Sequence, residues 1–330
     1  MQHVIEEPAI LGRVESLIGP ALVAAEQAYD RELASANPYL ADILSHTRRF
    51  RGKRLRPMLL LLSAEATGGI RDEHITLAAV IEMIHTATLV HDDVLDDADL
   101  RRHVATVNSR WNNSTSVLFG DYLFTHAFHL AASVGTTDAC RMIGRATNIV
   151  CEGELTQVRQ GGNLDLSEDE YLRIIEAKTG ELCAVACRLG ARYSDAGDAI
   201  ADGMDGYGRR LGIAFQIADD VLDLAGTERD TGKTLGSDLA QRKMTLPLIR
   251  LLSSVSNGST TRARELIAAA GSSSEVELQS LLVSSGALAS ARKTALDYAE
   301  KARRGLRLLP KSEGRTLLED VAEFAVRREF

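Results

Sequence analysis

The sequence predicts an all-α protein, and three observations support this fold class. No proline occurs between Pro57 and Pro247, which favours long helices because proline interrupts a helix interior. Apolar residues recur at helical spacing, as at Leu77, Ile81 and Ile84. No sustained alternation rich in β-branched residues, which is typical of strands, is present in this region.

Several helix ends can be placed along the chain. Ser167 and Glu170 form the pattern of a capping box, in which a serine and a glutamate start a helix together. Ser274 and Glu277 repeat this pattern and predict a second helix start. Glycines that should end helices occur at Gly68-Gly69, Gly161-Gly162 and Gly197.

The chain is expected to form one large helical domain over residues 1–330. At 330 residues it exceeds the usual domain size, but no change in composition divides it. Its low-complexity pieces, residues 253–260 and 271–274, resemble surface loops more than domain linkers.

Composition excludes several functions and indicates a compartment. The 38 Lys and Arg against 46 Asp and Glu give a net charge of −8, which argues against nucleic-acid binding. A phosphate-bearing ligand must therefore be held by a local basic cluster or by metal ions.

We expect no signal peptide and no transmembrane segment. The cysteines match neither a C-x-x-C motif nor a disulfide framework, which indicates a cytoplasmic protein with reduced thiols. They are Cys140, Cys151, Cys183 and Cys187.

The pentapeptide DDVLD occurs twice, at residues 92–96 and 219–223. On a helix its first, second and fifth residues lie on one face. In the first copy these are Asp92, Asp93 and Asp96, and in the second Asp219, Asp220 and Asp223. Carboxylates crowded in this way repel one another, and a set of oxygen ligands suits Mg²⁺ shared with substrate phosphates. A single copy could equally be an acidic surface patch, but two identical copies favour a metal site.

Basic residues cluster near the first pentapeptide. Arg101 and Arg102 follow it, and residues 51–57 read RGKRLRP. Guanidinium and ammonium groups beside metal-binding carboxylates are expected around a diphosphate. A solvated charge run is the alternative for residues 51–56 alone.

These motifs resemble those of the trans-isoprenyl diphosphate synthases, the polyprenyl synthetase family, over nearly the whole chain. The matching segments, in family order, are residues 52–57, 84–96 with Arg101 and Arg102, 120–123, 178–180, 215–223, 232–233 and 243–247. The resemblance implies a helical bundle around a central cavity, and a homodimer. It also implies Mg²⁺-dependent elongation of an allylic prenyl diphosphate by isopentenyl diphosphate: the allylic diphosphate ionises, the isopentenyl double bond attacks the cation, and a proton is lost.

The resemblance also implies the roles of individual residues. Mg²⁺ ions, three per site with substrate bound, would be held by Asp92, Asp96 and Asp219, with Asp93, Asp220 and Asp223 in support. The diphosphate of isopentenyl diphosphate would be bound by Lys53, Arg56, His85 and Arg102. The allylic diphosphate would be surrounded by Arg101, Lys178, Thr179, Gln216, Lys233 and Lys243, of which Lys178 also serves catalysis.

Three residues depart from the family pattern, and two alternatives remain: an enzyme that cyclises or couples prenyl diphosphates, and a non-catalytic regulatory subunit. Arg51, His103 and Arg242 stand where the family usually has glycine, which alters loop geometry because glycine reaches a positive φ cheaply. Relatives that cyclise or couple prenyl diphosphates usually lack an intact second DDxxD motif, and non-catalytic regulatory subunits generally lose motif residues. This chain retains both aspartate motifs, which favours an elongating enzyme.

Product length should depend on the residues before Asp92. Short-chain family members commonly block the path of the growing tail with Phe or Tyr four or five residues before the first aspartate. Here those positions are Thr88 and Ala87, with Ile84 further along the same side of the helix. Alternatively, residue 87 could be alanine only because closely packed helices need a small side chain there. We expect a long-chain all-trans polyprenyl diphosphate, with geranylgeranyl diphosphate as the shorter alternative.

Overall fold

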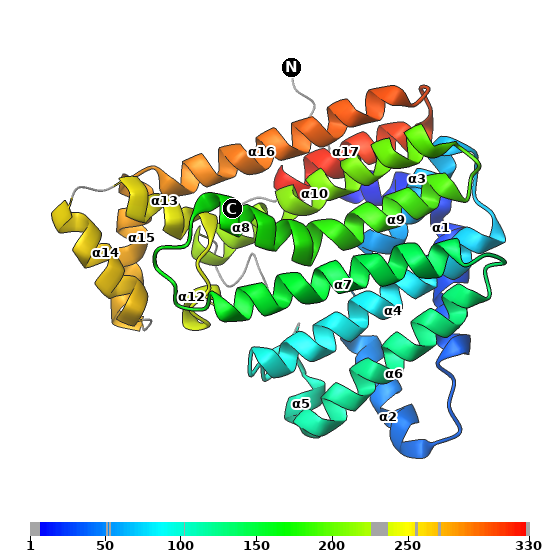
Figure 1. Cartoon of the computed structure of the whole chain (residues 1–330), viewed down its shortest axis with the longest axis horizontal. Helices are drawn as coiled ribbons and strands as arrows, with labels where there is room; N and C mark the ends of the chain where they lie inside the picture. The colour runs from blue at the N-terminus through cyan, green and yellow to red at the C-terminus, as the bar shows by residue number, and fades with distance from the viewer. Residues whose placement is uncertain are drawn as a thin grey trace. The chain divides into compact units, whose positions relative to one another are not determined.

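The computed structural model describes residues 7–50, 52, 54–101, 103–225, 237–254, 257–269 and 272–327. These residues are almost entirely helical (Figure 1), and their only strands are the short antiparallel pair β1 (Leu100–Arg101) and β2 (Val104–Ala105). The all-α prediction is confirmed.

The chain divides into two compact units. Unit 1 contains residues 1–147, 182–208 and 305–321, and unit 2 contains residues 148–181, 209–304 and 322–330. The boundaries fall inside the helices α7 (Asp138–Arg159), α10 (Asp198–Ala225) and α17 (Glu313–Arg327), so that each of these helices contributes to both units. The single domain expected over residues 1–330 stays a prediction.

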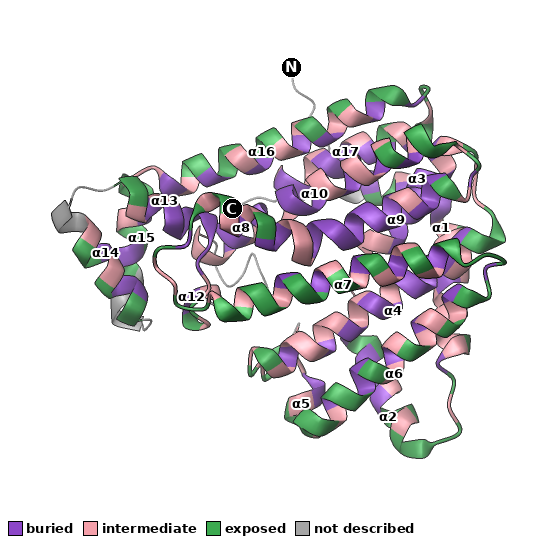
Figure 2. Ribbon diagram, viewed as in Figure 1, coloured by how far each residue is buried: buried purple, intermediate pink, exposed green. Residues whose placement is uncertain are grey.

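Unit 1 is built around α4 (Asp72–Leu95), which packs on α1 (Glu7–Glu32), α3 (Leu55–Thr67) and α6 (Asn113–Ala132). The leucines of α3 from Leu59 to Leu62 are fully buried, as expected of a helix that is apolar on every side. The other elements that lie mainly in unit 1 are α2 (Pro38–Thr47), η1 (Arg48–Phe50), α5 (Val107–Arg110), α9 (Glu181–Arg192) and η3 (Leu306–Leu308). Figure 2 shows buried residues along α9 and α10.

Unit 2 has its own apolar core, formed by side chains of α8, α10 and α13–α16, with Ile217, Leu248 and Ala291 among its buried members. Its elements are α8 (Glu168–Ile175), the π-helical turn η2 (Glu176–Gly180), α12 (Ser237–Ala240), α13 (Leu246–Ser254), α14 (Asn257–Ala269), α15 (Ser272–Ser284) and α16 (Ala287–Gly305). Glu168 of α8 accepts two hydrogen bonds from Arg250 of α13, at 2.5 and 3.0 Å, which fixes the start of α8 against the core.

The helix ends agree with the sequence analysis at most positions. Ser167 caps α8, with Glu170 completing the capping box, as predicted. Gly68 ends α3. The helix start predicted after an N-cap at Ser274 is wrong by three residues, because α15 already begins at Ser272.

By length and composition, α4 alone among the helices of the described residues could cross a membrane. Within its most apolar window, 56% is buried inside the protein, and its contacts with three other helices are those of a core helix.

Candidate active site

The first aspartate motif lies where α4 ends. Leu95 is the last residue of α4, Asp96 follows as its C-cap, and the amide of Asp96 still donates to the carbonyl of Asp92 at 2.8 Å. A helix carries partial negative charge at its C-terminus, and the last turn of α4 contains no basic residue. The carboxylates therefore add to an already negative potential, which only a cation can compensate.

The structure separates the three aspartates of this motif. Asp92 and Asp96 are partly exposed, whereas Asp93 is 2% exposed and faces inward. Arg101 donates to Asp93 Oδ1 from Nη2 at 2.7 Å and from Nε at 3.0 Å. Burial raises the pKa of Asp93, and the guanidinium of Arg101 acts in the opposite direction. Asp93 is thus an internal anchor, and Arg101, expected at the allylic diphosphate, is its partner.

The second aspartate motif occupies the final turns of α10, which also has no basic residue in its last turn. The same division recurs within it. Asp219 and Asp223 are partly exposed, while Asp220 is 3% exposed. The amide of Asp238 on α12 donates to Asp223 Oδ2 at 3.1 Å.

Neutral donors hold Asp220 in place. The hydroxyl of Tyr171 donates to Asp220 Oδ2 at 2.5 Å, and Gln216 Nε2 donates to Oδ1 at 2.8 Å. Burial, together with the nearby charge of Asp238, raises the pKa of Asp220 well above its ordinary value. Thr179 extends this network by donating to Gln216 Oε1 at 2.9 Å. Thr179 and Gln216, both expected near the allylic diphosphate, are therefore brought together.

Two glycines allow the turn η2 to approach its neighbouring helices closely. A Cβ on Gly212 of α10 would lie 2.7 Å from Gly180 Cα, and a Cβ on Gly153 of α7 would lie 2.8 Å from the side chain of Ala177. The second approach places Lys178 beside α7, where Lys178 Nζ forms an ion pair with Glu154 Oε1 at 2.6 Å. The ammonium group expected to serve catalysis is thereby held by a carboxylate of the same unit.

Unit 1 also brings together two residues predicted to bind the diphosphate of isopentenyl diphosphate. Arg56 Nη1 lies 3.0 Å from His85 Nε2. Arg56 Nε is buried and has no hydrogen-bond partner among the described residues. Arg54, within the same basic segment, forms an ion pair with Glu26. Lys53 and Arg102, predicted for the same diphosphate, lie outside the described residues, as does Arg51.

The remaining basic residues predicted for the allylic diphosphate belong to unit 2. Lys243 is partly exposed and its amide donates to the carbonyl of Asp238 at 2.8 Å. Nearby, Thr245 Oγ1 is buried without a partner among the described residues. Lys233 lies outside the described residues.

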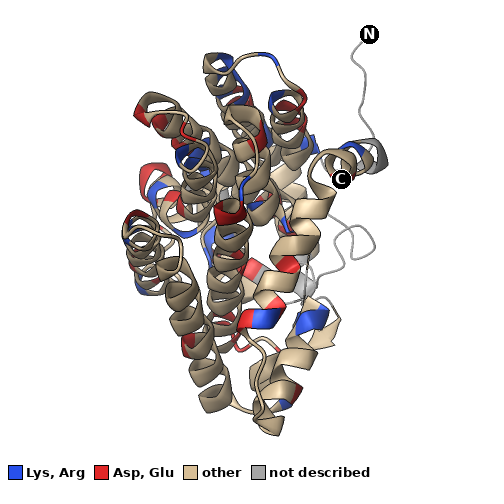
Figure 3. Cartoon of the chain, turned by 90° about the vertical axis from the view of Figure 1, so that its right-hand side faces the viewer, with Lys and Arg blue, Asp and Glu red and all other residues tan. Residues whose placement is uncertain are grey.

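Each aspartate motif has the chemistry that Mg²⁺ requires. Figure 3 shows acidic and basic segments interspersed on the helices. Within the described part of the chain, no three His, Cys, Asp or Glu side chains form a preassembled metal cage. Mg²⁺ ordinarily uses one or two carboxylates, several waters and the oxygens of substrate phosphates. The partly exposed carboxylates Asp92, Asp96 and Asp219 fit this use.

The residues predicted to govern product length are small or buried as they approach Asp92. Ala87 is fully buried and Ile84 is 1% exposed. Thr88 is partly exposed, and its hydroxyl donates to the carbonyl of His85 at 2.8 Å. No aromatic side chain stands at the two positions before the motif where family members with short products carry one.

Two departures from the family pattern adopt the backbone conformation that glycine favours. His103 has a φ of 62° and Arg242 a φ of 55°. His103 lies in the turn between β1 and β2, and the carbonyl of Arg242 accepts a hydrogen bond from the amide of Gly162 at 2.9 Å. The backbone of both residues is therefore in a left-handed conformation, which is strained for a residue with a Cβ.

The sequence analysis did not identify Tyr171 and Glu154, which contact the predicted site residues Asp220 and Lys178. Tyr171, Ile174 and Ile175 form one buried face of α8, so the pattern alone indicates an ordinary core residue. A hydrophobic face that includes tyrosine does suggest a buried hydroxyl in need of a partner. It does not identify Asp220, which lies 49 positions away.

The strained turns lead to a prediction about stability. His103→Gly and Arg242→Gly should each raise the free energy of unfolding, by up to about 1 kcal/mol, because relief of the left-handed strain exceeds the added entropy of the unfolded chain. Urea unfolding followed by circular dichroism measures the change. Asp99→Gly, at an exposed position without a positive φ, is the control and should lower stability. Lower stability for both test variants would show that these side chains contribute more than the strain costs.

Comparison with known proteins places this geometry in a family. Residues 37–283 match the family model described as polyprenyl synthetase. The chain is 36% identical over 282 residues to octaprenyl diphosphate synthase of Escherichia coli, covering 84% of this chain and 86% of that protein. It is 37% identical over 307 residues to nonaprenyl diphosphate synthase of Mycobacterium tuberculosis, covering 92% and 91%.

A solved structure agrees with the sequence comparisons. The polyprenyl synthase of Caulobacter crescentus, crystallised with calcium and isoprenyl diphosphate, superposes with a TM-score of 0.92 at 34% identity, over 97% of this chain and 98% of that one. The chain belongs to the polyprenyl synthetase family.

Proposed function

We propose that this protein is a Mg²⁺-dependent prenyltransferase that elongates an allylic diphosphate with isopentenyl diphosphate to a long-chain all-trans polyprenyl diphosphate. The observation that carries the proposal is that the aspartates of both DDVLD motifs are arranged in the same way. In each motif the second aspartate is buried and hydrogen-bonded within the protein, and the first and fifth are partly exposed at the negative end of a helix. The long-chain synthases similar to this chain support the reaction class.

The reaction requires stabilisation of a departing anion. The bond between C1 of the allylic substrate and its diphosphate breaks, and the diphosphate leaves with the electron pair. The isopentenyl double bond then forms the new carbon–carbon bond at C1, and loss of a proton restores an alkene. Mg²⁺, when bound, would neutralise charge that develops on the diphosphate. Preorganised cationic side chains lower the barrier in the same way.

We assign the basic residues to the two diphosphates as the sequence predicts. Arg56 and His85, which lie in contact, would hold isopentenyl diphosphate together with Lys53 and Arg102. Lys178, held by Glu154, would bind the allylic diphosphate with Lys233 and Lys243. Arg101, Thr179 and Gln216 would support the aspartate motifs while lying beside that diphosphate.

The proposal includes a homodimer that works in the cytoplasm. On α6 the adjacent side chains of Val117 and Leu118 are 43% and 68% exposed, and apolar side chains of this kind are suited to contact with a second copy. Cys140, Cys151, Cys183 and Cys187 have free thiols, which is compatible with a reducing compartment.

Loss of one ligand carboxylate tests the reaction and the metal assignment together. Asp92→Ala and Asp219→Ala should each lower turnover at least about a hundredfold, because each removes charge stabilisation of the leaving group. The assay is release of diphosphate from isopentenyl diphosphate plus an allylic primer, with helicity checked by circular dichroism. Asp99→Ala, which changes an exposed aspartate beyond the first motif, should behave as wild type. Near-wild-type turnover in either motif variant would refute the assignment, and an inactive wild-type protein would refute the reaction.

Filling the space at Ala87 tests the product. Chromatography of wild-type products should show chains longer than farnesyl diphosphate. Ala87→Phe should shorten the product while the first condensation persists, because the diphosphate-binding residues are unchanged. Because overpacking a buried site costs about 1–3 kcal/mol, Ala87→Leu serves as a milder variant with a smaller expected shortening. Farnesyl diphosphate as the wild-type product, or unchanged length in both variants, would show that this side of α4 does not set the length.

A further inference from the structure

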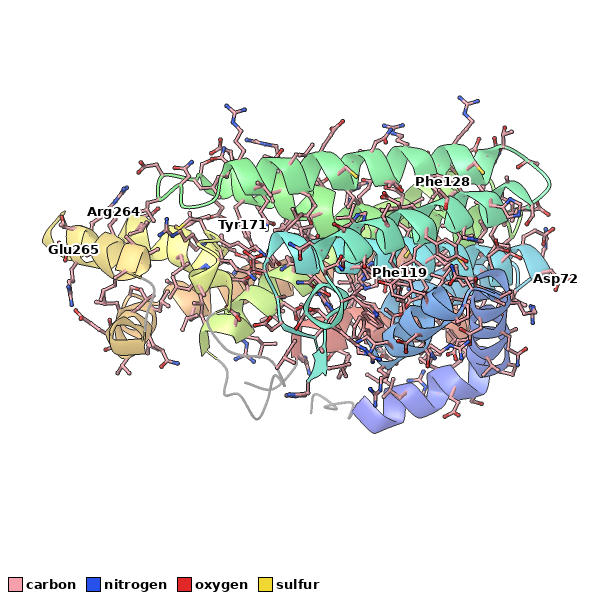
Figure 4. The ribbon with its side chains drawn as sticks, turned by 90° about the horizontal axis from the view of Figure 1, so that it is seen from below. Asp72, Phe119, Phe128, Tyr171, Arg264 and Glu265 are labelled. Atoms are coloured by element: carbon pink, nitrogen blue, oxygen red, sulfur yellow. The ribbon has the colours of Figure 1, made fainter. Side chains whose placement is uncertain are left out.

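Tyr171 is the only side chain of α8 for which the described part of the structure shows a hydrogen bond to an aspartate motif. Its hydroxyl lies 2.5 Å from Asp220 Oδ2, and the residue is 3% exposed. Tyr171 is labelled among the side chains in Figure 4. The two residues are 49 positions apart and lie on different helices of unit 2. The contact is therefore made by the tertiary fold and not by local chain geometry.

The environment of Tyr171 leaves its ring little freedom to move. The ring belongs to the apolar core of unit 2, together with Ile174 and Ile217. Upstream of it, the capping box of Ser167 and the two hydrogen bonds from Arg250 to Glu168 fix the start of α8. The hydroxyl is thus presented to Asp220 from a rigid support.

In the described part of the chain, Asp220 accepts hydrogen bonds from two donors, one for each carboxylate oxygen. Gln216 donates to Oδ1 and Tyr171 to Oδ2. Gln216 precedes Asp220 by one helical turn on α10, so its bond cannot fix the rotation of α10 relative to the core. Tyr171, on another helix, provides a fixed external point directly to Asp220, whereas Thr179 of η2 reaches Asp220 only through Gln216.

We infer that Tyr171 is a positioning residue for the second aspartate motif: by holding Asp220 in the core, its hydroxyl keeps Asp219 and Asp223 available for metal and diphosphate. The inference rests on the proposed function, since it assigns Tyr171 a role in positioning a motif that the proposed function assigns to metal binding. Groups behind the metal ligands that fix their orientation commonly matter in this way, and their loss weakens metal binding about tenfold to a hundredfold. Tyr171 and Asp220 together form such a group behind Asp219 and Asp223. Without the hydroxyl, one oxygen of a buried carboxylate has no donor, and Asp220 can relieve this by turning toward solvent, which displaces its neighbours.

Tyr171→Phe removes only the hydroxyl, and Tyr207→Phe is a matched control. Tyr207 is fully buried and donates to the carbonyl of Leu318 at 2.7 Å, away from both aspartate motifs. The measurement is calorimetric binding of inorganic pyrophosphate by the full-length protein as Mg²⁺ is varied. Both variants should lose some thermal stability. Only Tyr171→Phe should raise the Mg²⁺ concentration for half-maximal binding, by about tenfold to a hundredfold, and excess Mg²⁺ should restore binding.

An equal response of the two tyrosine variants to Mg²⁺ would overturn the inference, as would pyrophosphate binding that needs no Mg²⁺ in wild type. A second comparison sets Asp220→Asn against the double variant Tyr171→Phe/Asp220→Asn. If Tyr171→Phe does not fold, Asp220→Asn alone should raise the Mg²⁺ midpoint, because it replaces the buried carboxylate that Tyr171 holds, and an unchanged midpoint would overturn the inference. A residue that acts through Asp220 should have no further effect on the Mg²⁺ midpoint once Asp220 is replaced, so a further rise in the double variant would also overturn it.

The binding assay contains neither prenyl substrate, so that it separates this inference from the proposed function. A wild-type protein that binds Mg²⁺ and pyrophosphate but forms no product would contradict the function alone.

Discussion

Carboxylates placed at the negative ends of two helices are the constraint on which the rest of this structure depends. Asp92, Asp93 and Asp96 lie where α4 ends, and the second motif lies in the last turns of α10. Each acidic side chain near a helix C-terminus costs roughly 0.3–1 kcal/mol, in addition to repulsion from its neighbours. The protein limits this cost by burying one aspartate of each motif against donors, and a bound cation would offset the charge that remains.

The buried aspartates of the two motifs are held by different kinds of hydrogen-bond donor. Asp93 is held by the guanidinium of Arg101, a charge-assisted contact made through two nitrogens. Asp220 is held by two neutral donors, a tyrosine hydroxyl and an amide, and burial is the largest cause of its raised pKa. The position of Asp220 thus depends on the geometry of its hydrogen bonds. Thr179 of η2 contributes to that geometry by donating to Gln216, and η2 can approach α10 closely because residue 212 is glycine.

The sequence predicted the parts of the protein that follow from composition, periodicity and motif. The helical class was evident from the absence of proline and from helical spacing, and α8 begins at the capping box that Ser167 indicated. The contact between Arg56 and His85 agrees with their assignment to one diphosphate. His103 and Arg242 stand where the family usually has glycine, which marked both positions in the sequence as unusual, and both have a positive φ.

The sequence could not reveal which aspartate of each motif faces inward. Helical spacing placed all three on one side, but the choice of anchor depends on partners that folding supplies, such as Tyr171 for Asp220. The ion pair between Lys178 and Glu154 also depends on tertiary structure, since it requires η2 to pack on α7 at Gly153. Periodicity identifies a face, whereas hydrogen-bond partners within that face depend on tertiary packing.

A crystal structure of the protein with Mg²⁺ and a diphosphate tests the central claim most directly. The account predicts that carboxylate oxygens of Asp92, Asp96 and Asp219 lie about 2.0–2.1 Å from Mg²⁺. It also predicts that Asp93 and Asp220 keep Arg101 and Tyr171 as partners and contact no ion. Coordination of Mg²⁺ by Asp93 or Asp220 would contradict the division of each motif into one anchor and two exposed carboxylates.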